Sequence, residues 1–258
     1  MTEIPDFPLA VPLLVLGVLI PLLPRLARQV LTVLVPLSLL GVLLQMEPGT
    51  RLTGSFAGFD LVFFQLSEVN FVFGVIFLAI SAIASVYALH VNDAGQQAAS
   101  VLYAAGAIGV TFAGDFLTLL IFWELMAVAS AWLIFARREA ESVRAGFRYI
   151  MVHFAGGSVL LGGILLHYHE TGSLALEAFA PGSGLAAWLI LVGVCVNVAL
   201  PPLHAWLADA YPRATVTGAI FMSALTTKSA VYVLLTLFPG WQILIYMGLI
   251  MALYGVVY

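Results

Sequence analysis

Long apolar stretches separated by short polar connections make up nearly all of this 258-residue chain. A helix that crosses a bilayer needs about 20 mainly apolar residues, at a rise of about 1.5 Å per residue. By this measure the pattern predicts nine membrane helices, at 8–24, 29–46, 70–91, 98–113, 115–136, 147–168, 186–211, 215–238 and 241–258. The predicted fold class is therefore an all-α membrane protein.

The seventh predicted helix is broken. Its apolar run ends at Leu200, and Pro201-Pro202 removes two backbone donors before LHAWLADAY resumes. Such a break is tolerated at membrane depth only where protein or a water-filled cavity satisfies the freed carbonyls. Outside the helices, the Gly- and Thr-rich connection 47–69 predicts a hairpin. The sequence LALEAF within 169–185 predicts a short surface helix.

Composition supports the membrane assignment and excludes several function classes. Hydrophobic residues make up 63% of the chain and charged residues 9%, against about 25% charged in a typical soluble domain. The net charge of −4 leaves no basic face for nucleic acid. The single cysteine, Cys195, excludes a disulfide framework, and no pattern for a metal or cofactor ligand set stands out. We therefore predict no metal and no cofactor.

The arginines predict how the chain sits in the membrane. With strict alternation of the helices, only Arg51 falls on one face, and seven arginines fall on the other: Arg25, Arg28, Arg137, Arg138, Arg144, Arg148 and Arg213. The positive-inside rule makes the face with seven arginines cytoplasmic. The opening MTEIPDF carries acidic residues instead of the basic ones of a secretory signal, so the first helix is predicted to be retained. These patterns predict a multi-pass protein of the inner (plasma) membrane with its N-terminus outside.

Two ionisable residues lie deep within predicted helices. Lys228, the only lysine, has more than a turn of apolar sequence on each side, and Glu124 lies near the middle of helix 5. A lysine at a helix centre costs roughly 2.5–3.5 kcal/mol on insertion scales, and intramembrane ionisable residues usually serve function. The pair could be a structural ion pair that fixes helix register. A proton-carrying pair is the interpretation we favour.

Other polar residues are candidates for a proton path or for packing. Histidine as a residue type titrates near neutral pH, so His153 can relay a proton, or it can be a neutral core histidine. His204 and Asp209 either line a half-channel or satisfy the backbone freed by the proline break. Thr227 adds a hydroxyl beside Lys228, and Asp115 is predicted to be an exposed cap of helix 5. Close helix packing is expected at Gly156, Gly157, Gly162 and Gly163.

Three motifs, FWELM, PPLHAWLADAY and TTKSAVY, together resemble the antiporter-like membrane subunits. These are the D subunit of Mrp-type multisubunit cation/proton antiporters and the proton-pumping subunits of respiratory NADH:quinone oxidoreductase. The resemblance covers most of the chain, most clearly from Gly114 onward. It implies that Glu124 and Lys228 are the helix-5 glutamate and helix-8 lysine of the family's central polar axis.

The resemblance also implies a domain organisation and two departures. It places three leading helices and an outer loop in 1–97, a five-helix antiporter-like repeat (helices 4–8) in 98–238, and the start of helix 9 in 239–258. Where the family commonly has a helix-7 lysine, seven residues before His204, this chain has Asn197, which can hold water but cannot carry the charge. The sequence stops at Tyr258, whereas relatives continue through a second repeat. We therefore expect either a half-length subunit completed by another chain or a truncated product, and no transport by the chain alone.

These observations predict a membrane subunit that contributes a proton half-channel to a multisubunit ion-translocating complex. Glu124 and Lys228 are predicted to transfer protons, along a path that comprises His153, Asn197, His204, Asp209 and Thr227. The expected partners are other membrane subunits, with a chain that supplies the second repeat as a candidate among them. Lipid and protons are also expected, with Na+ as a candidate second ion. Two alternatives are a quinone-binding membrane redox subunit and a non-conducting structural subunit.

Overall fold

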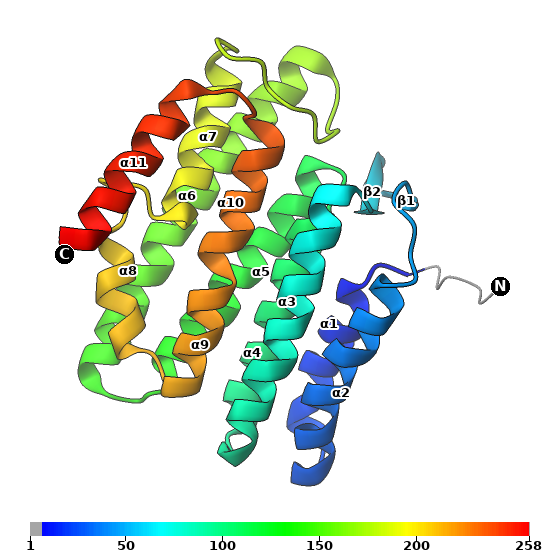
Figure 1. Ribbon diagram of the computed structural model, residues 1–258, viewed down its shortest axis with the longest axis vertical. Helices are drawn as coiled ribbons and strands as arrows, with labels where there is room; N and C mark the ends of the chain where they lie inside the picture. Colours follow the sequence, from blue (N-terminus) through cyan, green and yellow to red (C-terminus); the bar gives the residue numbers. More distant parts are fainter. Residues whose placement is uncertain (1–6, 258) are drawn as a thin grey trace.

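The computed structural model describes residues 7–257, so the expectations that rest on residues 1–6 and on Tyr258 lie outside it. Figure 1 shows a bundle of helices with one small hairpin. The helices before the hairpin and the two strands are α1 (Ala10–Leu19), η1 (Ile20–Leu22), α2 (Arg25–Leu43), β1 (Arg51–Phe56) and β2 (Phe59–Gln65). They are followed by α3 (Glu68–Tyr87), η2 (Ala88–His90), α4 (Ala94–Phe112), α5 (Phe116–Phe135) and α6 (Ala140–Thr171). The remaining helices are α7 (Leu185–Val198), α8 (Ala205–Ala210), η3 (Tyr211–Arg213), α9 (Val216–Ala224), α10 (Thr226–Leu237) and α11 (Gln242–Val257).

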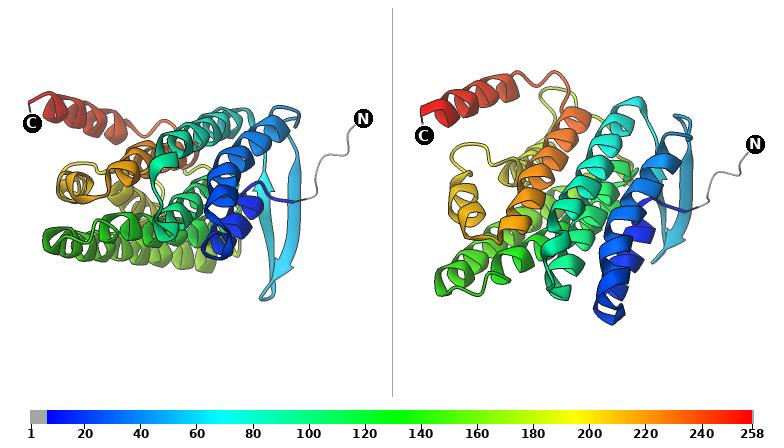
Figure 2. Two further views of the ribbon diagram at one scale, coloured as in Figure 1. Left: turned by 90° about the horizontal axis from the view of Figure 1, so that it is seen from below. Right: turned by 60° about the horizontal axis from the view of Figure 1, so that its bottom comes forward.

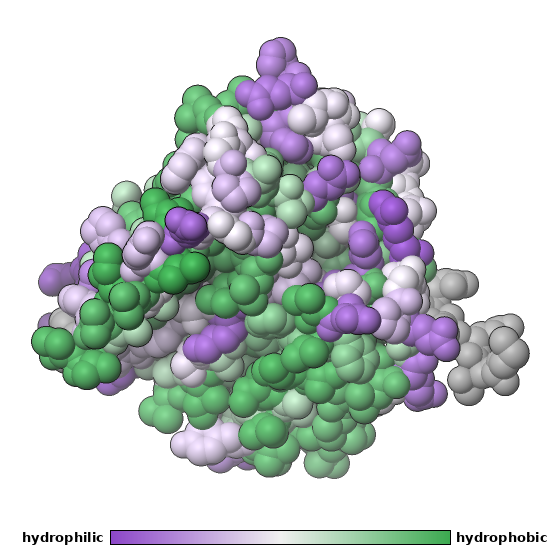
Figure 3. All heavy atoms as spheres, turned by 45° about the horizontal axis from the view of Figure 1, so that its top comes forward, coloured by the Kyte–Doolittle hydropathy of each residue, from purple (hydrophilic) through white to green (hydrophobic). Residues whose placement is uncertain are grey.

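Five of these helical segments are long and apolar enough to cross a membrane: Arg25–Leu43, Glu68–His90, Phe116–Phe135, Ala140–Thr171 and Val216–Leu237. Three shorter apolar helices accompany them, Ala10–Leu22, Leu185–Val198 and Gln242–Val257. Figure 3 shows broad apolar areas on the surface, with hydrophilic residues gathered toward the upper end and the right-hand edge. A surface of this kind suits lipid, and the chain is a mostly helical membrane protein.

Helix α4 forms the centre of the bundle. Nearly all of it is buried from Gln97 to Phe112, and it packs against α1, α3 and α5. The segment is rich in alanine and glycine, whose small side chains let neighbouring helices approach closely. At the opposite extreme, α11 has no buried residue and stands at the edge of the bundle (Figure 2).

Polar residues begin four of the helices. Ser67, Asp93, Asp115 and Thr215 each accept a hydrogen bond from a backbone N–H of the first helical turn. The predicted cap at Asp115 is confirmed, but its predicted exposure is wrong. Asp115 is only 2% exposed, because its carboxylate also accepts a 2.7 Å hydrogen bond from the backbone N–H of Val62 in the hairpin.

The two predictions for the polar connections have opposite outcomes. The hairpin predicted within 47–69 is confirmed, since β1 and β2 pair antiparallel around a turn at Ala57 and Gly58. The surface helix predicted at LALEAF is wrong, because this stretch is extended. Its backbone exchanges hydrogen bonds with 114–116, and Phe179 packs against the rings of Phe116 and Phe238.

The arginines predicted to share one face do gather at one end of the bundle, the lower end in Figure 1. Arg28 bonds to Asn92, Arg138 to Asp93, and Arg137 to the backbone of Pro212. These contacts tie the start of α2 and the loops before α4, α6 and α9 to one another. Arg51 lies on β1, at the hairpin end.

Candidate functional site

The carboxylate of Glu124 lies between α5 and α6. Glu124 is half-buried, and its Oε1 atom sits where a side chain at Gly157 would begin, 1.9 Å from the position of a Cβ there. Only glycine leaves this space. Among residues 7–257 no ion pair and no hydrogen bond engages the Glu124 carboxylate.

His153 lies one turn before Gly157 on the same face of α6, because residues four apart in a helix share a face. It is 1% exposed, and its ring stacks on Tyr149 at 4.0 Å and meets the edge of Trp206 at 4.6 Å. Its Nδ1 donates to the backbone carbonyl of Tyr149 at 3.0 Å, which leaves the Nε2 lone pair free to accept a proton. This Nε2 is buried and has no partner in the described chain.

Several other buried polar atoms on the surrounding helices also lack partners within the described residues. They are Nε1 of Trp123 on α5, Oδ1 of Asn197 on α7 and Oγ of Ser229 on α10. Helix α6 packs against α5 and α7, and α7 packs against α10. Buried polar groups are nearly always hydrogen-bonded in proteins, to other groups or to ordered water. The unpaired atoms therefore mark places where water can be bound.

A side-chain hydrogen bond that the sequence did not reveal spans the break between α7 and α8. Helix α7 ends at Val198, and Ala199 adopts a left-handed conformation with φ of 62°. The indole Nε1 of Trp206 donates a 2.8 Å hydrogen bond to the carbonyl of Val196 in the last turn. Neither His204 nor Asp209 makes this contact, and the Val196 carbonyl also accepts the backbone N–H of Ala199.

Lys228 occupies a second interruption, between α9 and α10. The two helices meet at Leu225, and Nζ of Lys228 donates a 2.5 Å hydrogen bond to the carbonyl of Ser223 in the last turn of α9. Lys228 is exposed at the surface of the chain. No carboxylate within residues 7–257 pairs with it, so the structure does not join it to Glu124.

The sequence comparisons decide the family. Residues 113–257, more than half of the chain, match the family described as "NADH:quinone oxidoreductase/Mrp antiporter, TM". The chain belongs to this family. The matched region contains α5 to α11, and with them every residue discussed above for the site.

Relatives in this antiporter-like family come from several membrane complexes. The NADH-quinone oxidoreductase subunit N of Cereibacter sphaeroides is 30% identical over 165 residues, which cover 62% of this chain and 37% of that protein. A Na(+)/H(+) antiporter subunit of Alkalihalophilus pseudofirmus is 29% identical over 150 residues, covering 54% of this chain and 18% of that protein. The chain thus spans well under half the length of both relatives.

A solved structure shares the fold. It is that of the membrane-bound sulfane sulfur reductase, an archaeal respiratory membrane complex. One of its chains superposes with a TM-score of 0.77 at 25% sequence identity, over 89% of this chain and 40% of that one. The shared fold therefore extends over nearly the whole of the chain, including helices before residue 113.

The remaining site residues of this family member lie in two other places. Thr227 and His204 line an apolar groove of about 390 Å³ beside α11, where the His204 ring meets Tyr254 at 4.6 Å. Asp209 lies at the arginine-bearing end. The structure thus places Glu124 and His153 beside the same face of α6, whereas no hydrogen bond or ion pair within residues 7–257 joins Thr227, His204 or Asp209 to them.

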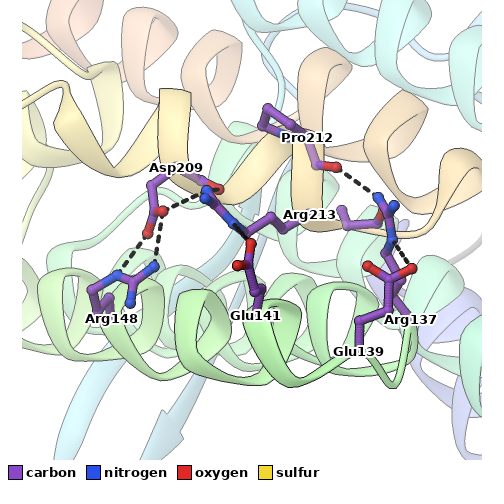
Figure 4. A network of polar contacts seen from close by, with 8 residues as sticks. Arg137, Glu139, Glu141, Arg148, Asp209, Pro212 and Arg213 are labelled. Carbon is purple, nitrogen blue, oxygen red and sulfur yellow. Dashed lines mark hydrogen bonds and ion pairs between the residues drawn. The ribbon is translucent and has the colours of Figure 1, made fainter.

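Figure 4 shows the ion pairs around Asp209. Its carboxylate accepts two hydrogen bonds from Arg148 on α6, at 2.8 and 2.9 Å, and one from Arg213 at 2.6 Å. Arg213 also lies 3.7 Å from Glu141. Exposed ion pairs of this kind contribute about 0–1 kcal/mol each, so they orient α8 against α6 more than they stabilise the fold. A place for Asp209 on a proton path stays a prediction.

Proposed function

We propose that the chain contributes a proton half-channel to a multisubunit cation/proton antiporter or a related respiratory ion-translocating complex. The observation that carries this proposal is the arrangement beside α6, where the Glu124 carboxylate lies against Gly157, one helical turn from His153. Within the described residues neither Oε1 of Glu124 nor Nε2 of His153 has a partner. Membership of the family and the relatives' names support it. A proton then moves between Glu124 and His153 through bound water.

The unpaired polar atoms explain how water could remain in an apolar bundle. A buried water is stable where two to four polar groups can bond to it. Nε1 of Trp123 donates, whereas Nε2 of His153, Oδ1 of Asn197 and the Glu124 carboxylate accept. Asn197 can hold such a water without adding a charge of its own.

Lys228 supports the proposal of a partner subunit. An exposed lysine in the middle of an apolar segment faces lipid at a cost of roughly 2.5–3.5 kcal/mol unless protein or water covers it. The neighbouring α11 is apolar and has no buried residue. We infer that other membrane subunits, or a chain with a second repeat, cover this side and complete the path from Lys228. Protons are the proposed cargo, with Na+ as a candidate second ion.

The number of membrane crossings and the division of the chain into repeats are part of the same proposal. Helical segments occupy each of the nine predicted places, and the interruption between α7 and α8 falls at the predicted break of helix 7. These facts support nine membrane crossings. They also support three leading helices in 1–97, the five-helix repeat in 98–238, and a ninth helix from 239 onward.

A structural, non-conducting role is the second candidate. It is favoured by the lack of contact between Glu124 and Lys228, and by an uncharged Asn197 where the family commonly has a lysine. In that case the polar residues would only orient the helices.

Proton flux in membrane vesicles that carry the assembled complex separates the two candidates. Glu124→Gln is expected to lower the flux by roughly 100-fold or more, the usual effect of losing a positioned proton-transfer group. Glu177→Gln, at an exposed carboxylate in the loop before α7, is the control and should leave the flux unchanged. Ordinary flux in Glu124→Gln would favour the structural role.

The proposed orientation places the arginine-bearing end in the cytoplasm and the N-terminus outside the inner (plasma) membrane, by the positive-inside rule. Cysteines introduced near 45–50, beside the hairpin, should react with an impermeant thiol reagent added to intact cells. Cysteines near 138–141, where the loop after α5 meets the start of α6, should react only after permeabilisation. Labelling of both loops from one side would contradict the orientation.

A further inference from the structure

A small polar cavity lies near the arginine-bearing end, between α2, α3, α4 and α9. Its volume is about 20 Å³, and its polar lining includes five buried residues, Thr32, Ser85, Gln97, Ser100 and Thr217. Each of these five residues is no more than 9% exposed. A cavity of roughly 10–15 Å³ or more can hold one water if two to four polar groups face it. We call it the Gln97 cavity.

The groups that face the Gln97 cavity are built for a polar occupant. Nε2 of Gln97 donates to the carbonyl of Val91 at 3.1 Å, which fixes the amide and leaves Oε1 buried without a partner in the described chain. The hydroxyls of Ser85, Ser100 and Thr217 likewise have no hydrogen-bond partner within residues 7–257. Three separate helices, α3, α4 and α9, thus present unpaired oxygen atoms to one small space.

The lining favours water over a cation. All of the lining residues are neutral, so no carboxylate among them offsets a positive charge. Arg28 lies one turn before Thr32 on α2, and its own Nε is buried without a partner in the described chain. A metal ion in the cavity would find no negative charge among these residues, whereas a water molecule can accept and donate as the hydroxyls require.

A line of hydroxyls continues from the Gln97 cavity toward the centre of the bundle. Ser100 lies one turn before Tyr103 on α4, and the hydroxyl of Tyr103 bonds to that of Thr226 at the start of α10. The backbone N–H of Thr226 also donates to Tyr103. The Tyr149 hydroxyl interacts with Thr226 and bonds to Oγ of Ser130 at 2.8 Å.

The ring and the backbone of Tyr149 border the candidate site. Tyr149 stacks on His153 and accepts the Nδ1 proton of that residue at its backbone carbonyl. His153 shares its face of α6 with Gly157, against which the Glu124 carboxylate lies. The helices α4, α10 and α6 therefore bring together residues that are as many as 123 positions apart in the sequence.

We propose that the Gln97 cavity is the water entrance of the proton path on the arginine-bearing face, connected to His153 and Glu124 by the hydroxyls of Tyr103, Thr226 and Tyr149. This proposal rests on the proposed proton half-channel. In each step a hydroxyl or water accepts a proton on an oxygen lone pair and releases its own proton to the next oxygen. One proton enters at the cavity and one passes from the Tyr149 hydroxyl through bound water to Nε2 of His153 or the Glu124 carboxylate, and each hydroxyl ends with one O–H bond, as it began.

The entrance can be tested without measuring transport. In the full chain with its native Cys195 replaced by alanine, Ser85→Cys and Ser100→Cys place a thiol in the cavity. Ala84→Cys and Ala99→Cys, the buried neighbours on the same helices, are the matched controls. Membrane vesicles are treated with Ag+ on the arginine-bearing face, and the thiols left unreacted are then alkylated after denaturation.

Water access predicts that Ag+ protects the thiols at 85 and 100 much faster than those at 84 and 99. Equal rates for the cavity and control positions would overturn the entrance. The experiment is repeated with Na+ replaced by choline. If protection in choline then needs 100-fold less Ag+ than in Na+, a bound cation occupies the cavity in place of water, and this result would also overturn the entrance. None of these outcomes depends on whether Glu124 carries protons.

Transport in the assembled complex tests the connection. Tyr103→Phe is expected to lower proton flux by about 10- to 100-fold, because it removes one hydroxyl from the line. Tyr232→Phe is the matched control. It removes the hydroxyl of a different buried tyrosine, on α10, and should leave proton flux unchanged. Normal flux in Tyr103→Phe would overturn the path even if the cavity is hydrated. Loss of flux in Tyr103→Phe with normal flux in Glu124→Gln would instead contradict the proposed role of Glu124.

Discussion

Replacing Gly163 by alanine is expected to destabilise the protein by about 1–3 kcal/mol, the usual cost of overpacking a close contact. A Cβ at this position would lie 2.7 Å from the backbone nitrogen of Ile190 and 3.0 Å from the backbone oxygen of Ala186. Backbone atoms cannot turn aside as a flexible side chain can. Helices α6 and α7 would have to separate, and their contact is among the most extensive in the bundle.

Gly162→Ala is the matched control on the adjacent residue. No atom lies within 4 Å of a Cβ there, and alanine is favoured over glycine in a helix interior by about 0.8–1.0 kcal/mol. The control should therefore be neutral or slightly more stable. Unfolding of the two purified variants, followed by tryptophan fluorescence in detergent, measures the difference. Equal stability of the two would show that the α6–α7 contact is looser than the structure indicates.

This pair of residues also shows how far a sequence pattern reaches. Four glycines after His153 predicted close helix packing, and this is confirmed at Gly156, Gly157 and Gly163 but not at Gly162. The composition of a helix indicates that it packs closely. Which glycine faces a neighbour depends on the rotation of α6 within the bundle, and this is set by contacts with α5 and α7.

The hairpin and the LALEAF segment also show that local features can be predicted from the sequence, whereas features set by tertiary contacts cannot. Turn residues at Ala57 and Gly58 set the hairpin locally, so the sequence could predict it. LALEAF has a composition that suits a helix, but extended backbone bonds to 114–116 and the burial of Phe179 among aromatic rings outweigh that propensity. Similarly, the predicted eighth helix is divided at Leu225, and no proline or glycine there indicates the division.

The candidate site was predictable in its ionisable residues and not in its connections. Glu124, His153 and Lys228 stand out because ionisable groups are rare in apolar helices. Tyr103, Tyr149 and Trp206 look like ordinary aromatic packing residues in the sequence. Their hydrogen bonds to Thr226, Ser130 and the Val196 carbonyl arise from tertiary contacts between distant helices. The spacing of four between Tyr149 and His153 was the one signal available.

The structure changes what is expected from removing the charges of Glu124 and Lys228. Breaking a buried ion pair by removing one partner costs about 3–5 kcal/mol, and replacing both partners is often nearly neutral. Here the two residues make no ion pair within the described chain, and α5 and α10 have little mutual contact. The stability effects of Glu124→Gln and Lys228→Met should therefore add, within about 0.3–0.5 kcal/mol, as they do for independent sites.

Each single variant should also fold. Lys228→Met loses one hydrogen bond to the carbonyl of Ser223. It also removes a charge from an apolar segment, where a charge costs roughly 2.5–3.5 kcal/mol. Glu124→Gln keeps the shape of the side chain beside Gly157. Leu235→Met, seven residues beyond Lys228 on the exposed face of α10, is the control for introducing methionine there.

Proton flux should respond quite differently from stability. If the two residues are separate proton-transfer groups on one path, each single variant and the double variant should lose flux by roughly 100-fold or more. The loss of either group interrupts the whole path. The cycle is measured twice, by the yield and unfolding of the assembled complex and by flux in vesicles. A stability coupling of several kcal/mol would reveal a direct pair formed only in the complex. Full flux in the double variant would show that neither charge carries protons, since both are absent from a complex that still transports them.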